Sequence, residues 1–240
     1  MASRDLTIDG LANARDLGGL ERADGSTTPH GVFVRAELLD GVTPRGWDAL
    51  RAHGVRTIID LRRPDERSGR VPDDIDLVVV DLDGDERHFW EPIEADGRWG
   101  TPLYYLDHMR DLPHRLSEAL AAIARADEGA VLFHCGAGWD RTGMVAAVLL
   151  RALDVTPDAA LADYLQSFTN AEAMTALHAR TFHVDERHAI LTRHGHTAES
   201  AFRSVYGRLD LDEWFRTADI SDDTRRAIST WRGAVPAADT

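Results

Sequence analysis

Cys135 and Arg141 are separated by five residues in a glycine-bearing segment. The segment at 131–143 has the sequence V-L-F-H-C-G-A-G-W-D-R-T-G. A loop of this kind between a strand and a helix can turn its backbone N–H groups toward an anion, and the start of the helix adds partial positive charge. The guanidinium of Arg141 adds a planar pair of donors that matches two phosphate oxygens. The pattern predicts a phosphate-binding loop that consists of Gly136, Ala137, Gly138, Trp139, Asp140 and Arg141.

A thiol in such a loop would ionise easily. A free cysteine with a pKa of about 8.5 is only about 3% thiolate at pH 7, whereas helix N-termini and cationic neighbours lower cysteine pKa values to roughly 3.5–7.5. The Cys135 thiolate would attack phosphorus in line and form a thiophosphate intermediate. The loop amides and Arg141 would stabilise the equatorial oxygens in the transition state, so the reaction needs no metal and no cofactor.

The pattern is specific because the chain has only one cysteine. With 11 histidines, 19 glycines and 27 arginines in 240 residues, a random order would place His before that cysteine, Gly three after it and Arg six after it in roughly 4 of 10,000 cases. The alternative is a buried structural cysteine beside a helix start, which is the usual fate of a lone cysteine. The other histidines lack the spacing of metal ligands, so no metal site is predicted; they include His183, His188, His194 and His196.

The overall composition excludes several other classes of function. The net charge is −14, and all basic residues are arginine, so a Schiff-base lysine or a lysine general base is impossible. The acidic charge argues against nucleic acid as a partner and against binding to an acidic membrane. A single cysteine fits a reducing compartment. Since the start of the chain shows no signal peptide and no apolar run could span a bilayer, we expect a cytoplasmic protein without stable membrane insertion; the oligomeric state is left open.

Short apolar runs alternate with helix signals in the first two thirds of the chain. Strands are expected at 31–35, 56–61, 77–82 and 130–134, the last three of them buried. Thr43 followed by proline predicts a helix start, and Gly54 predicts its end. A further helix is expected around 116–123, and the apolar run at 142–153 predicts a central, buried helix.

The last third of the chain carries only helix signals. Thr156, Thr197 and Ser221 are expected to cap three of these helices. We therefore predict an α/β fold with a central, mostly parallel sheet flanked by helices and a helical C-terminal layer. Residues 1–240 are expected to form one domain, with an α/β catalytic core at 13–170 and a helical extension at 171–240.

One polar segment, 83–100, does not fit the alternation. It contains glycines together with Phe89, Trp90 and Trp99, and we expect a long irregular excursion. Its aromatic rings would either form a mobile lid over the site or pin the loop to the core.

The H-C-x5-R-T loop resembles that of the cysteine-dependent phosphatase superfamily. More narrowly, the chain resembles a bacterial tyrosine phosphatase family whose loop is H-C-x-A-G-K-D-R-T-G. Three further motifs of that family occur in the same order: N-x-R-D-L-G-G at 13–19, I-D-L-R at 59–62 followed by Glu66, and D-Y-L-x-S at 163–167. The resemblance implies a phosphatase-like fold and hydrolysis of phosphate monoesters. The substrate would be a phosphorylated protein or a small phosphomonoester: phosphotyrosine and, in some members, phosphoserine, phosphothreonine or phosphoinositides.

The resemblance also implies residue roles. Cys135 is the nucleophile, Arg141 the phosphate clamp and Asp140 the general acid, while Thr142 would donate a hydrogen bond to the sulfur and ease its departure. The residues themselves leave the acid open, because Arg141 would pull the pKa of the neighbouring Asp140 down. Three other carboxyl groups follow a predicted strand and could swing in from a loop instead: Asp81, Asp83 and Asp85.

Trp139 stands where these relatives have a lysine. The change removes a positive charge that suits multiply phosphorylated lipid heads. It would offer a flat apolar wall instead, which favours an aryl phosphate that can stack.

Several residues are expected to support the loop. Asp60 and Arg62 close a strand at the same sheet edge and are expected to form an ion pair. His134 is expected to act as a hydrogen-bond donor behind the nucleophile. The segment 15–19 predicts a turn with a local Arg–Asp pair, and the resemblance makes it a support of the active site.

Two other classes share part of the pattern. Sulfur transfer of the rhodanese kind also uses a cysteine in a loop, but those loops are usually shorter or lack the H-C-x5-R-T frame. A non-catalytic phosphate-binding module would tolerate the loss of Cys135 or Arg141. The presence of both residues therefore favours an enzyme.

Overall fold

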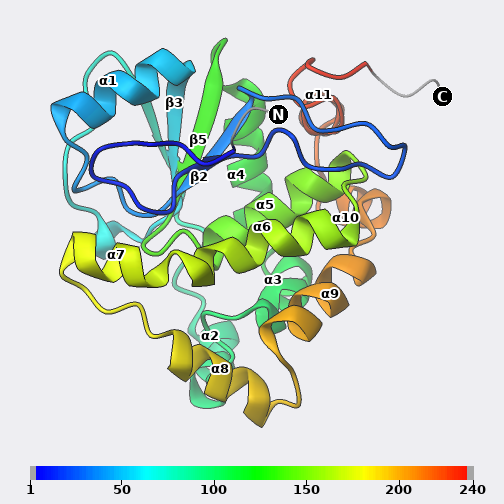
Figure 1. Ribbon diagram of the computed structural model, residues 1–240. Coiled ribbons are helices and arrows are strands. Elements are labelled where there is room, and N and C mark those ends of the chain that lie inside the picture. The colour runs from blue at the N-terminus through cyan, green and yellow to red at the C-terminus, as the bar shows by residue number, and fades with distance from the viewer. Residues whose placement is uncertain (1–3, 237–240) are drawn as a thin grey trace.

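Five strands form the central sheet of the computed structural model, which describes residues 4–236. They are β1 (Arg15–Asp16), β2 (Phe33–Ala36), β3 (Val55–Asp60), β4 (Asp76–Val79) and β5 (Ala130–His134). The spatial order is β1-β2-β5-β3-β4, and every neighbouring pair is parallel except β1 with β2 (Figure 1). The predicted α/β fold with a mostly parallel sheet is confirmed.

The two faces of the sheet are covered by different helices. The helices of this part are α1 (Pro44–His53), α2 (Arg87–Ala95), α3 (Tyr105–Asp111), α4 (Pro113–Arg125) and α5 (Arg141–Ala152). Ile58 and Leu132 face α1 in one hydrophobic core, whereas Ile59 and Phe133 face α4 and α5 in a larger one. This alternation follows from the two-residue period of a strand, which turns neighbouring side chains to opposite faces.

The predicted signals for α1 and α5 are confirmed. Thr43 accepts a hydrogen bond from the amide of Gly46, and Gly54 ends α1 with φ at 98°. Every residue of α5 from Arg141 to Leu150 is buried, as expected for a helix that is apolar nearly all round.

From position 157 to 229 the chain consists of helices and their connections, as predicted. Its helices are α6 (Pro157–Thr169), α7 (Ala171–His178), α8 (Val184–Arg193), α9 (Ala198–Arg208), α10 (Leu211–Thr217) and α11 (Asp222–Ser229). Thr156, Thr197 and Ser221 each accept a hydrogen bond from a first-turn amide, so the three caps are confirmed. No helix within residues 4–236 is both long and apolar enough to cross a membrane.

The expectation of an irregular excursion at 83–100 is wrong, because its middle part forms α2. Phe89, Trp90 and Ile93 lie on one buried face of this helix. Both rings belong to the large hydrophobic core, and Trp90 packs edge to face on Tyr104 with ring centroids 5.4 Å apart, so they pin the segment to the core. Trp99 lies beyond the helix and stays 44% exposed. Pro92 inside the helix and the flanking glycines hid its amphipathic pattern in the sequence.

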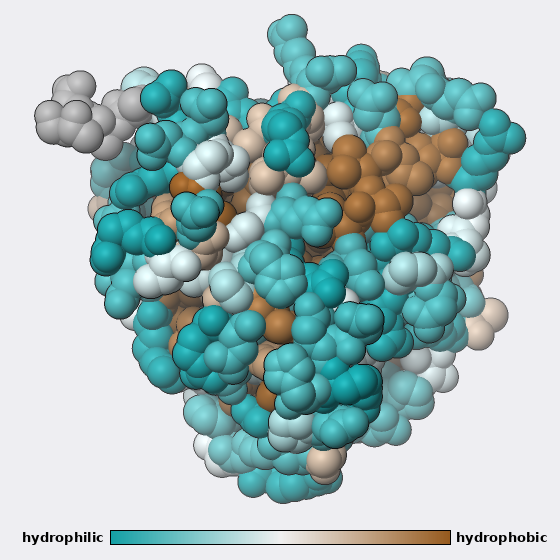
Figure 2. Space-filling view, turned by 180° about the vertical axis from the view of Figure 1, so that it is seen from behind, coloured by the Kyte–Doolittle hydropathy of each residue, from teal (hydrophilic) through white to brown (hydrophobic). Residues whose placement is uncertain are grey.

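The prediction of a buried strand at 77–82 is also wrong in part. The strand ends at Val79 and lies at the edge of the sheet, where Leu77 and Val79 are exposed. Figure 2 shows hydrophobic surface gathered over this side of the molecule. Only Val80 and Leu82, which follow the strand, are buried in the core.

Candidate active site

The predicted phosphate loop lies between β5, which ends at His134, and α5, which begins at Arg141. Asp60 ends the neighbouring strand β3 directly beside His134. The loop therefore lies at the carboxyl edge of a parallel sheet, where binding sites of α/β proteins form. Cys135 is the first loop residue and is 2% exposed.

The carbonyl groups of the loop are held from the outside. Three successive carbonyl oxygens accept hydrogen bonds: that of Gly136 from the Leu38 amide at 3.1 Å, that of Ala137 from Asn13 Nδ2 at 3.2 Å, and that of Gly138 from Arg35 Nη2 at 2.7 Å. In a trans peptide the N–H of the next residue points away from the carbonyl. The amides of the following residues therefore turn away from the scaffold, toward the centre of the loop.

Gly138 makes this close approach possible. Its φ is 67°, and a Cβ atom would lie 2.5 Å from the carbonyl oxygen of Ala36. A larger residue would push the loop away from the sheet.

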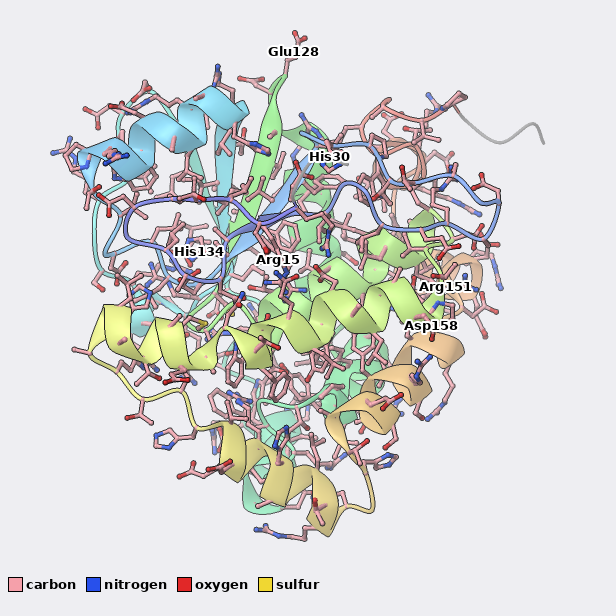
Figure 3. All side chains as sticks on the ribbon, in the orientation of Figure 1. Arg15, His30, Glu128, His134, Arg151 and Asp158 are labelled. Carbon is pink, nitrogen blue, oxygen red and sulfur yellow. The ribbon has the colours of Figure 1, made fainter. Side chains whose placement is uncertain are left out.

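The N-terminal motif and the motif after α5 meet behind the loop. Arg15 donates hydrogen bonds to Asp163 at 2.9 Å and to Ser167 at 2.9 Å, reaching from β1 to α6 (Figure 3). Arg35 binds the second oxygen of Asp163 at 2.6 Å. Burial alone would raise the pKa of Asp163, but the surrounding arginines outweigh burial and hold it far below the usual range. This buried network joins the two motifs to the carbonyl of Gly138.

The expected local pair between Arg15 and Asp16 is wrong. Asp16 instead accepts hydrogen bonds from the amides of Gly18 and Gly31 at 2.6 and 2.8 Å. Its second oxygen also lies 2.8 Å from His53 Nε2. Arg15 turns the other way because the carboxylate and carbonyl of Asp163, the hydroxyl of Ser167 and the oxygens of Asn13 satisfy its fork better than one neighbour could.

Arg141 is held in place by acidic side chains. Both of its terminal nitrogens donate to Glu66, one of them at 2.8 Å, and Nη1 also lies 3.2 Å from Asp83 Oδ2. Burial would raise the pKa of Glu66, but hydrogen bonds and charge from Arg141 outweigh it and lower that pKa to about 2. The carboxylate therefore stays ionised and fixes the guanidinium at the end of the loop. The sequence motif contained Glu66 but did not reveal this contact.

The expected ion pair of Asp60 and Arg62 is confirmed, with Nη2 and Oδ2 2.9 Å apart. Arg62 also donates to the carbonyl oxygen of Glu66 at 3.2 Å, so the pair supports the partner of Arg141. His134 Nδ1 lies 3.2 Å from the carbonyl oxygen of Cys135, and burial lowers the pKa of this imidazole. A neutral ring that can donate to the backbone agrees with the supporting place expected for it (Figure 3).

Two carboxyl groups near the loop are protonated more easily than usual. Burial raises the pKa of Asp140 to about 6, in spite of the opposing charges of Arg187 and Arg141. The expectation that Arg141 would dominate is therefore wrong. Burial also raises the pKa of Asp83 to about 6. Of the other carboxyl groups considered, Asp81 binds the amide of Gly84 and Asp85 is exposed.

Two tyrosines that the sequence did not single out hold Asp140. Tyr104 Oη donates to Asp140 Oδ2 at 2.7 Å, and Tyr105 Oη donates to its backbone carbonyl at 2.9 Å. Gly143 allows this approach, because a Cβ there would lie 2.8 Å from Tyr105 Oη. In the sequence, Gly143, which follows R-T in the loop motif, was the signal that could have indicated the contact with Tyr105. Within residues 4–236, Asp140 Oδ1 and Thr142 Oγ1 are buried without a hydrogen-bond partner.

The idea that Trp139 offers an open wall to the substrate is wrong. Its ring is 1% exposed and stacks on Phe168 at a centroid distance of 4.9 Å. Ala171, Met174 and Phe182 enclose the ring from α7 and the segment after it. The tryptophan therefore anchors the loop to the C-terminal helices, and its backbone remains the part that faces the loop centre.

Replacing Tyr104 by phenylalanine is expected to raise the pKa of Asp140. The hydroxyl stabilises the charged carboxylate, and a hydrogen bond to a charged group contributes about 1.5–3 kcal/mol, so its loss corresponds to roughly one pKa unit or somewhat more. A general acid works only while it is protonated, so activity falls as the pH rises through the pKa of Asp140. In Tyr104→Phe this fall should occur at a pH that is higher by a similar amount. The pH profile of kcat measures this shift. Tyr105→Phe loses only the hydrogen bond to the backbone, so its activity should fall at the same pH as that of wild type. If Tyr104→Phe also loses activity at the wild-type pH, Tyr104 does not set the pKa of a catalytic Asp140.

Comparison of the sequence with known proteins finds one matching family and several relatives. A model of the tyrosine phosphatase family matches residues 6–231. The "Putative tyrosine-protein phosphatase" of Cupriavidus necator is 33% identical over 180 residues, which cover 68% of this chain and 63% of that protein. A tyrosine-protein phosphatase of Nostoc commune is 33% identical over 127 residues, or 51% of this chain and 43% of that protein. The triple specificity protein phosphatase PtpB of Mycobacterium tuberculosis is 32% identical over 204 residues, with 70% of each chain covered.

The chain thus spans less than two thirds of the length of the first two relatives. The family model, in contrast, extends over nearly all of it, including the loop, the two motifs behind it and the C-terminal helices. From this match we conclude that the chain belongs to the tyrosine phosphatase family.

Proposed function

We propose that this chain hydrolyses phosphate monoesters, with phosphotyrosine in proteins as the preferred substrate, through a cysteinyl-phosphate intermediate on Cys135. The observation that carries the proposal is the loop whose carbonyls are bonded outward, with a thiol at one end and a fixed guanidinium at the other. Inward amides and an arginine fork together match the oxygens of a phosphoryl group. Membership of the tyrosine phosphatase family and the names of the relatives support it.

In the first step, the sulfur of Cys135 forms a bond to phosphorus while the bond from phosphorus to the leaving oxygen breaks. Asp140 would transfer its proton to that oxygen, and its raised pKa of about 6 keeps part of it protonated near neutral pH. Asp83 is the alternative acid, with a similar pKa and a direct contact to Arg141. Throughout the step, Arg141 and the loop amides would hold the equatorial oxygens.

In the second step, water attacks phosphorus and the sulfur–phosphorus bond breaks. The carboxylate left by the first step accepts a proton from the water, and inorganic phosphate and the thiolate are released. The unpartnered hydroxyl of Thr142 is available to donate to the departing sulfur. No metal or cofactor takes part in either step.

Dual or lipid specificity is the second candidate, because one relative is named a triple specificity protein phosphatase. With Trp139 buried, the loop itself offers no second cation that would favour multiply phosphorylated lipid heads. Rhodanese-type sulfur transfer leaves the phosphate clamp formed by Arg141 and Glu66 without a purpose, and a non-catalytic phosphate-binding role leaves Cys135 without one.

A substrate panel tests the proposal. We expect wild-type protein to hydrolyse p-nitrophenyl phosphate and phosphotyrosine peptides, with kcat/KM for phosphotyrosine at least about tenfold above that for phosphoserine peptides or phosphoinositide vesicles, in keeping with the tyrosine phosphatase family that the chain matches. Release of inorganic phosphate measures each rate. Higher kcat/KM on phosphoinositides would replace the proposal by its second candidate, and thiosulfate turnover without phosphate release would contradict both.

Two further predictions accompany this function. We propose that the α/β core at 13–170 and the helical extension at 171–240 act as one catalytic unit, since Trp139 of the loop packs into the extension. The expected location in the cytoplasm stays a prediction from the single cysteine.

A further inference from the structure

Arg187 lies beside the phosphate loop although it belongs to α8 in the C-terminal layer. Its guanidinium carbon lies 4.9 Å from the centroid of the Trp139 ring. Trp139 in turn is fixed by stacking on Phe168 and by contact with Phe182. A cation over the face of a buried indole is attracted by the ring, so this rigid platform sets where the guanidinium lies.

The opposite side of Arg187 meets the segment that holds Asp140. A Cβ atom on Gly100 would lie 2.3 Å from Arg187 Nη1, so the guanidinium lies directly against the backbone there. Four residues further along the chain, Tyr104 donates its hydrogen bond to Asp140. Arg187 therefore lies at the rim of the site, between the loop and the segment that positions the proposed acid.

Within residues 4–236, Arg187 lacks the ion pair that other arginines near the site have. Among the residues that the structure describes, no carboxylate forms an ion pair or hydrogen bond with it, whereas Arg15, Arg35, Arg62 and Arg141 each have an acidic partner. Arg187 is near enough to Asp140 that its positive charge lowers the pKa of that carboxyl, against the effect of burial. Its side chain is partly exposed. A partly exposed guanidinium without an ion-pair partner, beside a phosphate site, is suited to bind an anion.

We propose that Arg187 is a specificity-determining residue that binds a carboxylate next to the phosphotyrosine of a peptide substrate. The inference rests on the proposed function, because the peptide must already present its phosphate to the loop. A guanidinium fork matches a carboxylate with two hydrogen bonds. A membrane is disfavoured as the source of the anion, because an acidic membrane would repel a protein with a net charge of −14 over a wide surface. A single carboxylate, in contrast, interacts only with the surroundings of Arg187.

The test compares two phosphotyrosine peptides that differ only in glutamate or glutamine beside the phosphotyrosine. We expect wild-type protein to show about five- to tenfold higher kcat/KM on the glutamate peptide, mostly through KM, and the preference to shrink as salt is raised. Arg187→Gln should abolish the preference, and Arg187→Lys should restore only part of it, because lysine keeps the charge without the fork. Because Arg187→Gln also removes a charge that lowers the pKa of Asp140, its effect is measured as the ratio of kcat/KM on the two peptides, and p-nitrophenyl phosphate, which has no second anion, serves as the reference for losses unrelated to the carboxylate.

Arg180→Gln is the matched control. Arg180 also lies over an aromatic ring, that of Phe182 at 5.9 Å, but it is exposed and does not lie over the Trp139 ring that Arg187 covers. This variant removes the same charge from the same part of the chain and should keep the full peptide preference.

Three results would overturn the inference. A wild-type protein without a preference has no subsite for a carboxylate. A preference that survives in Arg187→Gln assigns the subsite to another residue. Equal losses on both peptides and on p-nitrophenyl phosphate show that Arg187 only anchors α8. If wild-type protein does not hydrolyse p-nitrophenyl phosphate at all, it is the proposed function that fails, and the two failures are thereby distinguished.

Discussion

Cys135→Ser is expected to lower kcat by about 10⁵-fold or more, the scale on which removal of a catalytic nucleophile acts. A serine hydroxyl does not ionise beside Arg141 near neutral pH, so no nucleophile replaces the thiolate. The chain contains no other cysteine that could take over. The loss is checked by measuring phosphate release from p-nitrophenyl phosphate at a high enzyme concentration, with the rate of uncatalysed hydrolysis subtracted.

The same variant should still bind phosphotyrosine peptide. The outward bonds of the loop carbonyls and the contact between Arg141 and Glu66 do not involve the sulfur. Calorimetric titration is expected to give a Kd within about tenfold of the wild-type KM. Arg141→Lys should bind far more weakly, since lysine cannot make the bidentate contact. Residual turnover in Cys135→Ser within 100-fold of wild type would remove Cys135 from the role of nucleophile.

Asp140→Asn is expected to lower kcat by roughly 10²–10⁴-fold on an alkyl phosphate, the usual contribution of general acid catalysis. The effect should be much smaller on p-nitrophenyl phosphate, whose leaving group needs little protonation. The acid works only when it is protonated, so wild-type activity should fall as the pH rises through about 6, the raised pKa of Asp140. In Asp140→Asn this basic limb should disappear. The pH dependence of kcat on both substrates measures these effects.

Asp83→Asn is the companion variant, because burial raises the pKa of Asp83 to a similar value. The position of the basic limb alone cannot separate the two carboxyl groups. Their dependence on the leaving group can: we expect Asp83→Asn to affect both substrates equally, because Asp83 contacts Arg141 and would act on phosphate binding. A loss confined to the alkyl phosphate in Asp83→Asn, together with an unchanged Asp140→Asn, would transfer the acid role to Asp83.

The chemistry-bearing loop could be predicted from the sequence because all its signals are local. The strand before Cys135, the glycines of the loop and the apolar helix after Arg141 lie within about 20 residues. Helix caps such as Thr43 and Thr156 are local for the same reason, since they bond to amides of the next turn. Such features depend on neighbouring residues and can be inferred before the fold is known.

The parts that the sequence did not reveal depend on contacts between distant residues. Arg15 binds Asp163 across 148 positions of the chain, so the neighbouring Asp16 was a misleading partner. The raised pKa of Asp140 depends on its burial in the folded protein, which no local pattern reports. Trp139 became an anchor instead of an open wall because α6, α7 and the segment after them close over its ring.

The most direct test of the central claim is to trap the covalent intermediate. The substrate p-nitrophenyl phosphate, whose leaving group needs little protonation, is mixed with excess Asp140→Asn enzyme, the reaction is quenched in acid over a time series that begins at milliseconds, and the digested protein is analysed by mass spectrometry. Because that variant keeps Cys135 and loses the group that deprotonates the attacking water, the second step is slowed more than the first and the intermediate accumulates. We predict one additional phosphoryl group on the peptide that contains Cys135, formed at the rate of substrate cleavage. Stoichiometric phosphate release in the same quench series with no phosphoryl group on that peptide would contradict the account.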